Sequence, residues 1–462
     1  MPRSTFETEL SGLRRKFDSG ATRTYEWRRR QLKQLDRLLQ ENSTALNTAL
    51  KQDLGKCAVE ARLTETAFLR AEIAHALGHL KTWMRPKKRD MPLSLQPARA
   101  KLQAEPLGVV LIIAPWNYPV QLLLSPLASA LAAGNTAILK PSEVAPRCSA
   151  IIAELIPKYF KSDEVFVVEG GVAETTALLS LQFDHIFYTG NGHVARVVME
   201  AAAQHLTPVT LELGGKCPAW VDQSADLQST ARRLVWAKFL NAGQTCVAPD
   251  HILATRSTLE ALKPHLIAAI KAQFGEDTLQ SPDYGRIINA RHFDRLIGLL
   301  ANAQVVSGGQ HDMQQRFIAP TLVEGIGDSH PLMQEEIFGP ILPLIEVVDL
   351  DAALKSIRSH GKPLAVYAFT RDSNVKDVLF QHTASGALVF NMAVGHLGAP
   401  DVPFGGVGSS GMGSSHGEAG FRTFSHMRSI VYKPFWPDTL RLIMPPYGRV
   451  VERVIQHLVA KE

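Results

Sequence analysis

A regular alternation of short β-rich runs and longer helical runs in the first half of the chain limits the fold more than any other feature. The β-rich runs lie at residues 108–113, 137–139, 164–168, 185–188 and 209–211, and the helical runs at 120–133, 145–159, 173–181 and 192–205. Strands that alternate with helices predict a parallel sheet covered by helices on both faces. We therefore expect an α/β fold.

The segments on either side extend this class of fold. Apolar residues at helical spacing predict two long amphipathic helices near 25–50 and 60–83. A second α/β unit follows, with helical runs at 227–240 and 259–274 and strand runs at 252–255, 319–322, 341–347 and 366–370. The remaining segments are a Pro-punctuated stretch at 86–103, a Gly/Ser-rich stretch at 403–420, a strand at 429–433 and a basic helix at 449–458.

Bulk composition excludes several classes of protein. Of the 462 residues, 45% are hydrophobic and 20% are charged, as in ordinary globular proteins, and the net charge is only +5. No basic stripe with interleaved aromatic residues indicates a nucleic-acid partner. Four scattered cysteines without C-x-x-C spacing favour a reducing compartment. Because no apolar run reaches the ~18 residues of a membrane helix, we expect a cytoplasmic protein without an integral membrane segment.

Two short segments carry groups for covalent acyl chemistry. Cys246 ends the segment NAGQTC at 241–246, and Glu212 lies in LELGGK at 211–216. A lone cysteine is usually a small buried hydrophobic residue, and a single Glu is usually a surface residue. Cys246, however, follows a turn-forming run whose backbone N–H groups can point inward. Glu212 lies between two leucines at a strand end, where partial burial would raise its pKa toward that of a general base.

Asn117, in the segment PWNYP at 115–119, is a candidate for stabilising an oxyanion. Its side-chain amide, together with the backbone N–H of Cys246, could hold the oxygen of a tetrahedral intermediate. The alternative is an Asn that only forms a turn before Pro119.

These three segments and EEIFGP at 335–340 together resemble the aldehyde dehydrogenase superfamily over nearly the whole chain. The resemblance implies that Cys246 attacks an aldehyde to give a thiohemiacetal, whose hydride passes to a nicotinamide. Glu212 then activates the water that hydrolyses the thioester. The fold implied is a Rossmann-like cofactor domain, a second α/β catalytic domain and a small β oligomerisation element.

The resemblance also implies a dinucleotide site. Its residues would be Trp116, Lys140, Ser142, Glu143, Thr189, Gly190, Asn191, Gly214, Glu336 and Phe338. The family usually has Ser at the position of Asn191, so the phosphate contacts are expected to differ here. Glu143 near the ribose would repel a 2′-phosphate, so we expect NAD, with NADP as the alternative. The G-x-G-x-x-G at 406–411 does not follow an early strand and is interpreted as a loop near the active site.

Further segments resemble the class 3 branch, whose members are short and typically dimeric. They are SPDYGRIIN at 281–289, PFGGVG at 403–408, SGMG at 410–413 and TFSH at 423–426. This branch implies a homodimer and an apolar aldehyde substrate, aromatic or of medium to long chain. Tyr118, Trp236 and Phe390 would supply apolar bulk in the substrate tunnel. The stretch 393–401 departs from the family pattern. The identity of the substrate is therefore the property that the resemblance predicts least directly.

We expect the following division of the chain. Residues 1–85 and 104–210 form the NAD(P)-binding domain, 211–400 the catalytic domain, 86–103 and 421–462 the oligomerisation segments, and 401–420 the active-site loop.

Two alternatives remain at this stage. A thioester or ester hydrolase would need only the thiol and the carboxylate, and a non-catalytic relative would need neither. A metal site would use His75, His79 and Glu72, which could share one helical face. No H-E-x-x-H motif or further ligand cluster accompanies them, so no metal is expected.

Overall fold

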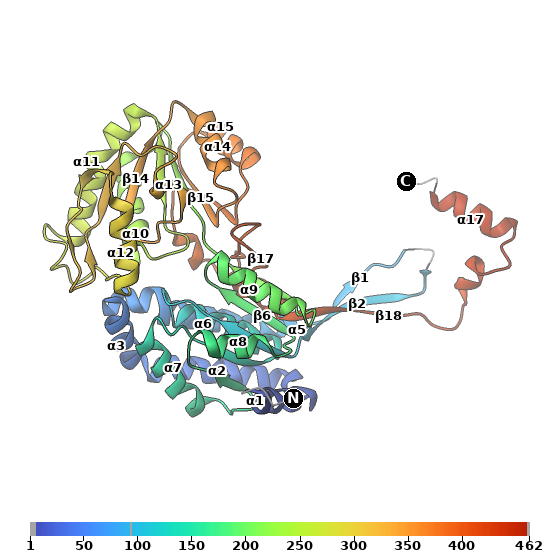
Figure 1. The fold of residues 1–462 in the computed structure, drawn as a ribbon. Helices are drawn as coiled ribbons and strands as arrows, with labels where there is room; N and C mark the ends of the chain where they lie inside the picture. Colours follow the sequence, from blue (N-terminus) through green and yellow to red (C-terminus); the bar gives the residue numbers. More distant parts are fainter. Residues whose placement is uncertain (1–5, 93–94, 460–462) are drawn as a thin grey trace.

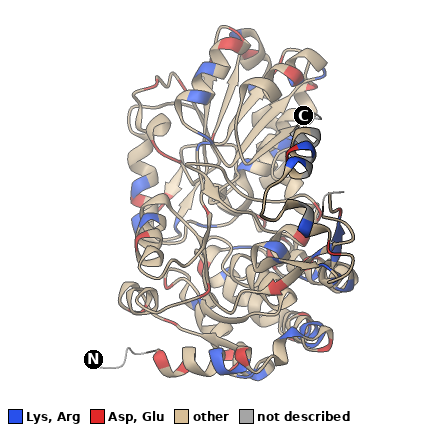
Figure 2. Ribbon diagram, turned by 90° about the vertical axis from the view of Figure 1, so that its right-hand side faces the viewer, with Lys and Arg blue, Asp and Glu red and all other residues tan. Residues whose placement is uncertain are grey.

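The computed structural model describes residues 6–92 and 95–459 as two α/β bodies with a β arm that projects from one of them (Figure 1). Each body is built on its own sheet. Figure 2 shows Lys and Arg interspersed with Asp and Glu over most of the helices that are in view.

The first body contains a six-stranded sheet in the order β17-β7-β6-β3-β4-β5. All pairs are parallel except β17 with β7. The strands are β3 (Val109–Ile113), β4 (Thr136–Lys140), β5 (Val165–Val167), β6 (His185–Thr189), β7 (Val209–Glu212) and β17 (Gly411–Met412). The sheet predicted for the first half of the chain is therefore present, and its strand order makes it doubly wound.

Helices cover both faces of this sheet. One layer holds α2 (Tyr25–Glu41), α3 (Ser43–Leu54), α5 (Ala67–Met84), α6 (Gln121–Ala133) and α7 (Pro146–Tyr159), and the other α1 (Glu7–Asp18), α8 (Val172–Leu179) and α9 (Gly192–Ala203). Val110 and Ile112 of β3 pack with the first layer. Val109 and Leu111 pack with the second. A strand buried on both faces is apolar throughout, which is why these runs show no polar alternation.

The direction of the chain across this sheet determines where a ligand can bind. From the central strand β3 the chain proceeds to β4 and β5 on one side, and then crosses to β6 and β7 on the other. Ligands of open α/β sheets bind at the carboxyl ends of the strands where this reversal occurs. Here that place lies between the loops that follow Ile113 and Thr189.

The second body contains a seven-stranded sheet in the order β10-β13-β14-β9-β8-β15-β16, in which only β10 is antiparallel to its neighbour. Its strands are β8 (Pro218–Val221), β9 (His251–Ala254), β10 (Gln304–Ser307), β13 (Thr321–Glu324), β14 (Ile341–Glu346), β15 (Ala365–Phe369) and β16 (Ala387–Phe390). Helices α10 (Leu227–Phe239), α11 (Arg256–Phe274) and α12 (Ala290–Leu300) pack on one face. Helices α14 (Leu350–Ser359) and α15 (Ser373–His382) pack on the other. Shorter elements are α13 (Pro331–Gln334) and the pair β11 (His311–Asp312) and β12 (Phe317–Ile318).

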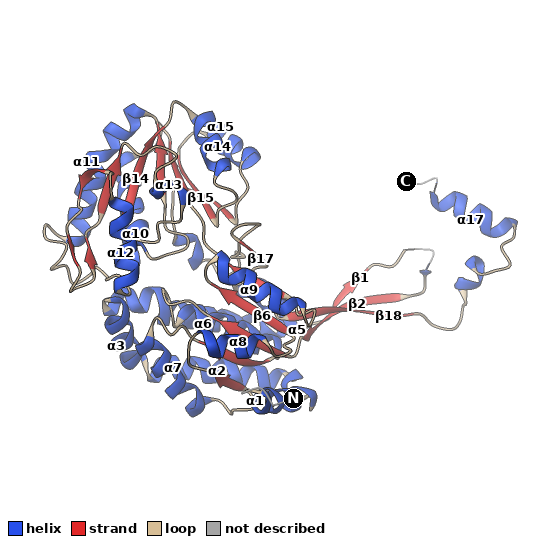
Figure 3. Cartoon of the chain, viewed as in Figure 1, coloured by secondary structure: helices blue, strands red, loops and turns tan. Residues whose placement is uncertain are grey.

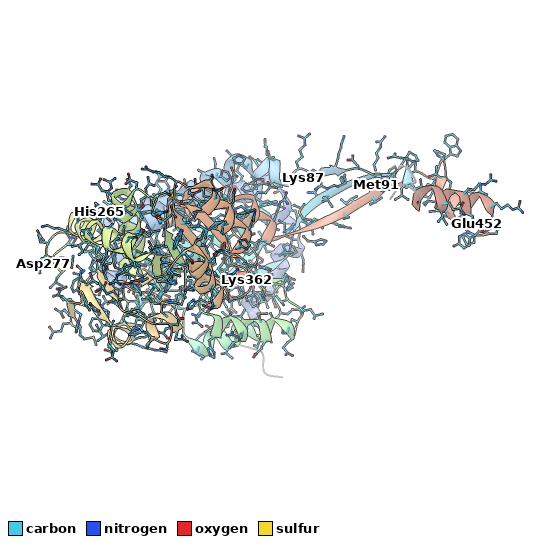
Figure 4. The ribbon with its side chains drawn as sticks, turned by 90° about the horizontal axis from the view of Figure 1, so that it is seen from above. Lys87, Met91, His265, Asp277, Lys362 and Glu452 are labelled. Carbon is cyan, nitrogen blue, oxygen red and sulfur yellow. The ribbon has the colours of Figure 1, made fainter. Side chains whose placement is uncertain are left out.

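The arm is a three-stranded antiparallel sheet in the order β1-β2-β18 (Figure 3). It comprises β1 (Lys87–Arg89), β2 (Arg99–Pro106) and β18 (Ser425–Tyr432), and the chain continues to α17 (Arg449–Val459). Seen from above, Lys87, Met91 and Glu452 follow one another outward along the arm, on the side opposite to His265 and Asp277 (Figure 4). The strand predicted at 429–433 is therefore the outer half of a longer one.

Two further differences from the sequence-based expectation have simple causes. The helix predicted over 25–50 is divided at Asn42, whose side-chain amide donates to the carbonyl of Leu38 at 2.9 Å. Strands β8, β10 and β16 of the second sheet were not predicted. For β8 and β16 the cause is that short apolar runs without alternation do not distinguish a buried strand from a buried helix.

Candidate active site

Cys246 follows a tight left-handed turn at the end of α10. Asn241, Ala242 and Gly243 have φ values of 53°, 51° and 76°. Only glycine fits at the third position, because a Cβ there would lie 2.2 Å from the carbonyl oxygen of Gly339. Residues held in this region of backbone conformation cost energy and cluster at functional sites.

Gln244 fixes the loop between this turn and the thiol. Its Nε2 donates to the carbonyl oxygens of Asn241 at 2.9 Å and Arg286 at 3.0 Å. Its Oε1 accepts the N–H of Ile288 at 3.0 Å. The buried amide is thus fully used within the protein and makes the loop rigid.

The Cys246 thiol is half-buried, and its surroundings disfavour the thiolate. Burial raises its pKa to about 12, and the nearby carboxylates of Glu336 and Glu212 add to the shift. Cys217, which is buried, donates its S–H to the carbonyl oxygen of Cys246 at 3.4 Å. Cys246 is therefore a protonated thiol until a positive charge or a base comes near it.

Glu212 is the last residue of β7 and is buried. The Ser415 hydroxyl donates to its Oε1 at 3.3 Å, and Oε2 has no hydrogen-bond partner among the described residues. Burial raises the pKa of this carboxyl well above its usual value, and the Ser415 contact opposes the shift. A buried carboxyl with a free oxygen is able to accept a proton from water.

Asn117 is buried and its amide is directed toward the cysteine loop. Nδ2 donates to the carbonyl of Gln244 at 3.0 Å, and the Asn117 carbonyl accepts from Asn241 Nδ2 at 2.8 Å. An amide nitrogen carries two hydrogens, so one N–H remains for a further acceptor. Asn117 Oδ1 has no partner within 6–92 and 95–459.

Trp116 and Phe338 form a ring pair, and the charge of Glu336 acts on the Cys246 thiol. The Trp116 and Phe338 rings lie edge to face with centroids 5.3 Å apart, and Phe338 has a φ of 47°. A Cβ at Gly214 would lie 2.2 Å from Glu336 Oε2. Burial and the charge of Asp250 raise the pKa of Glu336 to about 8.

Lys140 is the last residue of β4, and Ser142 and Glu143 follow it at the carboxyl edge of the first sheet. Lys140 Nζ donates to the carbonyl of Pro141 at 2.8 Å and lies 3.7 Å from Glu143 Oε2. Burial lowers the pKa of this lysine. Ser142 Oγ accepts the N–H of Val144 at 3.3 Å, so its hydroxyl hydrogen is free to donate.

Thr189, Gly190 and Asn191 join β6 to α9. Thr189 Oγ1 is buried and has no partner in the part of the chain that the structure describes. The Gly190 N–H donates to the carbonyl of Glu212 at 3.0 Å. Asn191 caps α9 by accepting the N–H of Val194 on Oδ1 at 3.0 Å. An orphaned hydroxyl and a helix N-terminus at the switch point fit a dinucleotide phosphate.

Of the three residues expected in the substrate tunnel, Phe390 lies apart from the cysteine loop. Tyr118 OH lies 2.6 Å from the hydroxyl of Thr245, next to Cys246, and Trp236 on α10 is 36% exposed. Phe390 packs instead with Trp220 and the helices α14 and α15, away from the cysteine loop. Its neighbour Val389 faces the cluster against which Cys246 packs. The expectation for Phe390 was wrong, because successive side chains of a strand point to opposite faces.

Sequence reasoning missed several residues of the site. Ser415 and Thr245 are the neighbours of Glu212 and Tyr118 described above, and hydroxyl residues at those positions carry no local signal.

The two histidines considered for metal binding make contacts with other parts of the protein. His79 Nδ1 lies 2.9 Å from the His75 carbonyl oxygen, and His75 Nε2 lies 3.0 Å from Asp401 Oδ1.

A doubly wound sheet beside a cysteine loop and a buried carboxylate is the arrangement of a dinucleotide-dependent oxidoreductase that works through an acyl-enzyme. The sequence model of the aldehyde dehydrogenase family matches residues 7–430. The chain is 46% identical over 459 residues to aldehyde dehydrogenase family 3 member B1 of Rattus norvegicus, covering 99% of this chain and 98% of that protein. It is 44% identical over 430 residues to the dimeric NADP-preferring aldehyde dehydrogenase of the same species, covering 93% and 95%.

A solved structure agrees with these relatives. The substrate-bound state of Staphylococcus aureus AldH matches with a TM-score of 0.96 and 40% identity, covering 99% of this chain and 100% of that chain. The chain therefore belongs to the aldehyde dehydrogenase family. The expected α/β fold, the enzyme class and the use of NAD or NADP are confirmed.

Proposed function

We propose that this enzyme oxidises an apolar aldehyde to the carboxylic acid through a thioester on Cys246. The observation that supports this best is the pairing of a half-buried thiol with a buried carboxyl, Glu212, whose charge acts on it. A nucleophile and a separate base are the two groups that acyl transfer to water requires.

The first half of the reaction consists of attack and oxidation. The Cys246 sulfur, after loss of its proton, attacks the aldehyde carbon, and the carbonyl oxygen becomes an oxyanion. The free N–H of the Asn117 amide and the Cys246 backbone N–H stabilise that oxygen. NAD or NADP, when bound, would supply the hydride acceptor that converts the thiohemiacetal into the thioester.

The second half is hydrolysis. Glu212 takes a proton from water as the water oxygen attacks the thioester carbon. The tetrahedral intermediate collapses, the C–S bond breaks, and the carboxylic acid leaves while the sulfur regains a proton. The unpartnered Oε2 of Glu212 is the atom that would accept the proton.

The residues around the first sheet fit the dinucleotide. Lys140, Ser142 and Glu143 would hold the adenosine ribose, and Thr189, Gly190 and Asn191 the pyrophosphate. Near the thiol, Trp116, Gly214, Glu336 and Phe338 would hold the nicotinamide half. Gly214 fits this role because any side chain there would meet Glu336. The half-exposed Glu143 opposes a 2′-phosphate, which favours NAD, whereas one relative is named NADP-preferring.

The substrate is proposed to be aromatic or of medium to long aliphatic chain. Tyr118 near the thiol and Trp236 on α10 supply apolar surface on this side of the second sheet. The names of the relatives state only that they act on aldehydes. A panel of aldehydes is therefore needed to define which substrate this enzyme prefers.

We further propose a cytoplasmic homodimer joined through the arm. Phe435 and Trp436 just beyond β18 are 101% and 85% exposed, which is unusual for aromatic residues on a monomer surface. One relative is named dimeric.

In the described part of the chain no helix is long and apolar enough to span a bilayer. All four cysteines are free, which suits a reducing compartment.

We propose the same division into domains as above, with the limits 1–85 and 104–210, 211–400, 86–103 and 421–462, and 401–420. The helices α2, α3 and α5 share one buried apolar cluster with α6, α7 and strands β3 and β4, and this supports their assignment to the cofactor domain.

The test uses aldehyde-dependent formation of NADH or NADPH. Cys246→Ala should abolish turnover while leaving NAD binding, measured by calorimetry, within about threefold. Glu212→Gln should give one fast turnover of NADH per site followed by slow hydrolysis. Full turnover by Cys246→Ala would disprove the mechanism.

A further inference from the structure

Three buried charged side chains that the proposed mechanism does not use lie directly behind the catalytic loops. Lys56 and Glu65 are fully buried, and Glu60 is 7% exposed. They come from the loop after α3, from α4 (Ala58–Ala61) and from the π-helical turn Arg62–Thr66. Buried charges are costly unless each is paired and hydrogen-bonded, so their partners show what they stabilise.

Lys56 has three neighbours for its three N–H donors. Its Nζ lies 2.6 Å from Glu65 Oε1 and 3.1 Å from the carbonyl oxygen of Asn117. It also lies 3.9 Å from the centroid of the Tyr118 ring, within the range of a cation–π contact. One ammonium group therefore holds both Asn117 and the residue that follows it.

Glu65 holds the other end of the same segment. Its Oε2 accepts the backbone N–H groups of Val120 at 2.9 Å and Gln121 at 3.2 Å. These groups begin α6, where unpaired N–H donors favour a carboxylate. The Lys56–Glu65 pair thus fixes the segment from Asn117 to Gln121 at both ends.

The third charge joins this segment to the cysteine loop. Glu60 Oε1 accepts the backbone N–H of Asn241 at 2.9 Å, at the start of the left-handed turn. Asn241 Nδ2 in turn donates to the Asn117 carbonyl at 2.8 Å. The Asn117 carbonyl therefore receives two donors, one from Lys56 and one from the cysteine loop.

We infer that Lys56 is a positioning residue for the oxidation, acting through Asn117. By fixing the Asn117 carbonyl, it holds the backbone from which the side-chain amide reaches the cysteine loop and the oxyanion. The inference rests on the role of Asn117 proposed above. A displacement of about 1 Å at such a group is enough to cost about a hundredfold in rate.

A double-mutant cycle on kcat/KM tests this role. Lys56→Met combined with Glu65→Gln removes both partners of the ion pair, and Glu60 keeps its hydrogen bond from the Asn241 N–H. This variant should lower kcat/KM about ten- to a hundredfold, with the KM for NAD within about twofold. Asn117→Ala should lower kcat/KM about a hundred- to a thousandfold. In the Asn117→Ala background, the Lys56/Glu65 change should cause less than a threefold further loss.

The matched control is Arg28→Met. Arg28 is another buried cation of the same body, and its hydrogen bonds go to the carbonyls of Thr22 and Ala132. It should lower the thermal midpoint but leave kcat/KM within about twofold. If the double variant does not fold, Lys56→Gln enters the same cycle.

Two outcomes of this cycle would overturn the inference, each for a different reason. If the Lys56/Glu65 loss multiplies with that of Asn117→Ala, Lys56 does not act through Asn117 and the inference is overturned. If Asn117→Ala alone keeps full kcat/KM, the proposed role of Asn117 fails first, and the inference fails with it.

Discussion

Glu212 and Gly411 are cross-strand partners at the edge of the first sheet. This pairing brings the Gly/Ser-rich segment 401–420 against the buried carboxyl, and Ser415 on that segment donates to Glu212. The G-x-G-x-x-G motif in this segment is therefore a support for the proposed base. The carboxyl and its hydroxyl partner come from residues 203 positions apart.

The Ser415 contact predicts a shift in the pH dependence of hydrolysis. Burial raises the pKa of Glu212, and the Ser415 hydroxyl opposes this by stabilising the carboxylate. Because the base acts when deprotonated, hydrolysis should increase with pH through this raised pKa. Ser415→Ala should move the midpoint up by about 0.5 to 1 pH unit, equivalent to roughly 1 kcal/mol. A stopped-flow pH profile of thioester decay checks it, and a downward shift would contradict it.

The same carboxyl predicts a pH-dependent gain in stability. A carboxyl whose pKa is higher in the folded than in the unfolded state destabilises the fold as pH rises above the unfolded value. Glu212→Gln removes this penalty. Its thermal midpoint should therefore exceed that of the parent at pH 8 and equal it at pH 4. Scanning calorimetry at both pH values measures the difference, and an equal effect at both would exclude a titrating cause.

How much of the fold and of the site can be predicted from the sequence depends on how far apart in the chain the interacting residues lie. Cys246, Glu212 and Asn117 could be proposed from the sequence because each lies in a local motif. Lys56 has its carbonyl partner 61 positions away, so no local pattern marks it. Phe390 was misplaced because the face that a strand side chain takes depends on neighbouring strands, and those pairings are set by the whole sheet.

The capping of α9 by Asn191 predicts separate effects on stability and on cofactor binding. Asn and Ser are similar N-cap residues, and loss of the cap typically costs about 1 kcal/mol. Asn191→Ser should keep the thermal midpoint, whereas Asn191→Ala should lower it. If the helix N-terminus holds the pyrophosphate, both variants should change the KM for NAD but not the KM for aldehyde. Unchanged NAD kinetics in both would remove Asn191 from the cofactor site.

The position of Phe390 predicts a structural role without an effect on substrate choice. Phe390 packs with Trp220 and Leu379 on the far face of the second sheet. Phe390→Ala should lower the free energy of unfolding by about 2 to 3 kcal/mol, somewhat less than a fully buried Phe. The ratio of kcat/KM for benzaldehyde-type to aliphatic aldehydes should stay constant. Trp236→Ala is the comparison variant, and that ratio should change there.

The proximity of Lys140 and Glu143 predicts how cofactor preference can be altered. The two side chains lie 3.7 Å apart, so the lysine already neutralises part of the carboxylate, and Glu143 is half-exposed. A 2′-phosphate would still meet the negative charge of Glu143, whereas the 2′-hydroxyl of NAD would not. Glu143→Gln should therefore increase the ratio of kcat/KM with NADP to that with NAD by about tenfold, equivalent to roughly 1.4 kcal/mol. The change should fall mainly in the KM for NADP, because Glu143 lies far along the chain from the thiol loop and contacts no catalytic group in the described residues. Steady-state kinetics with both cofactors and one saturating aldehyde measure it, and a ratio that stays the same would show that Glu143 is turned away from the ribose when the cofactor binds.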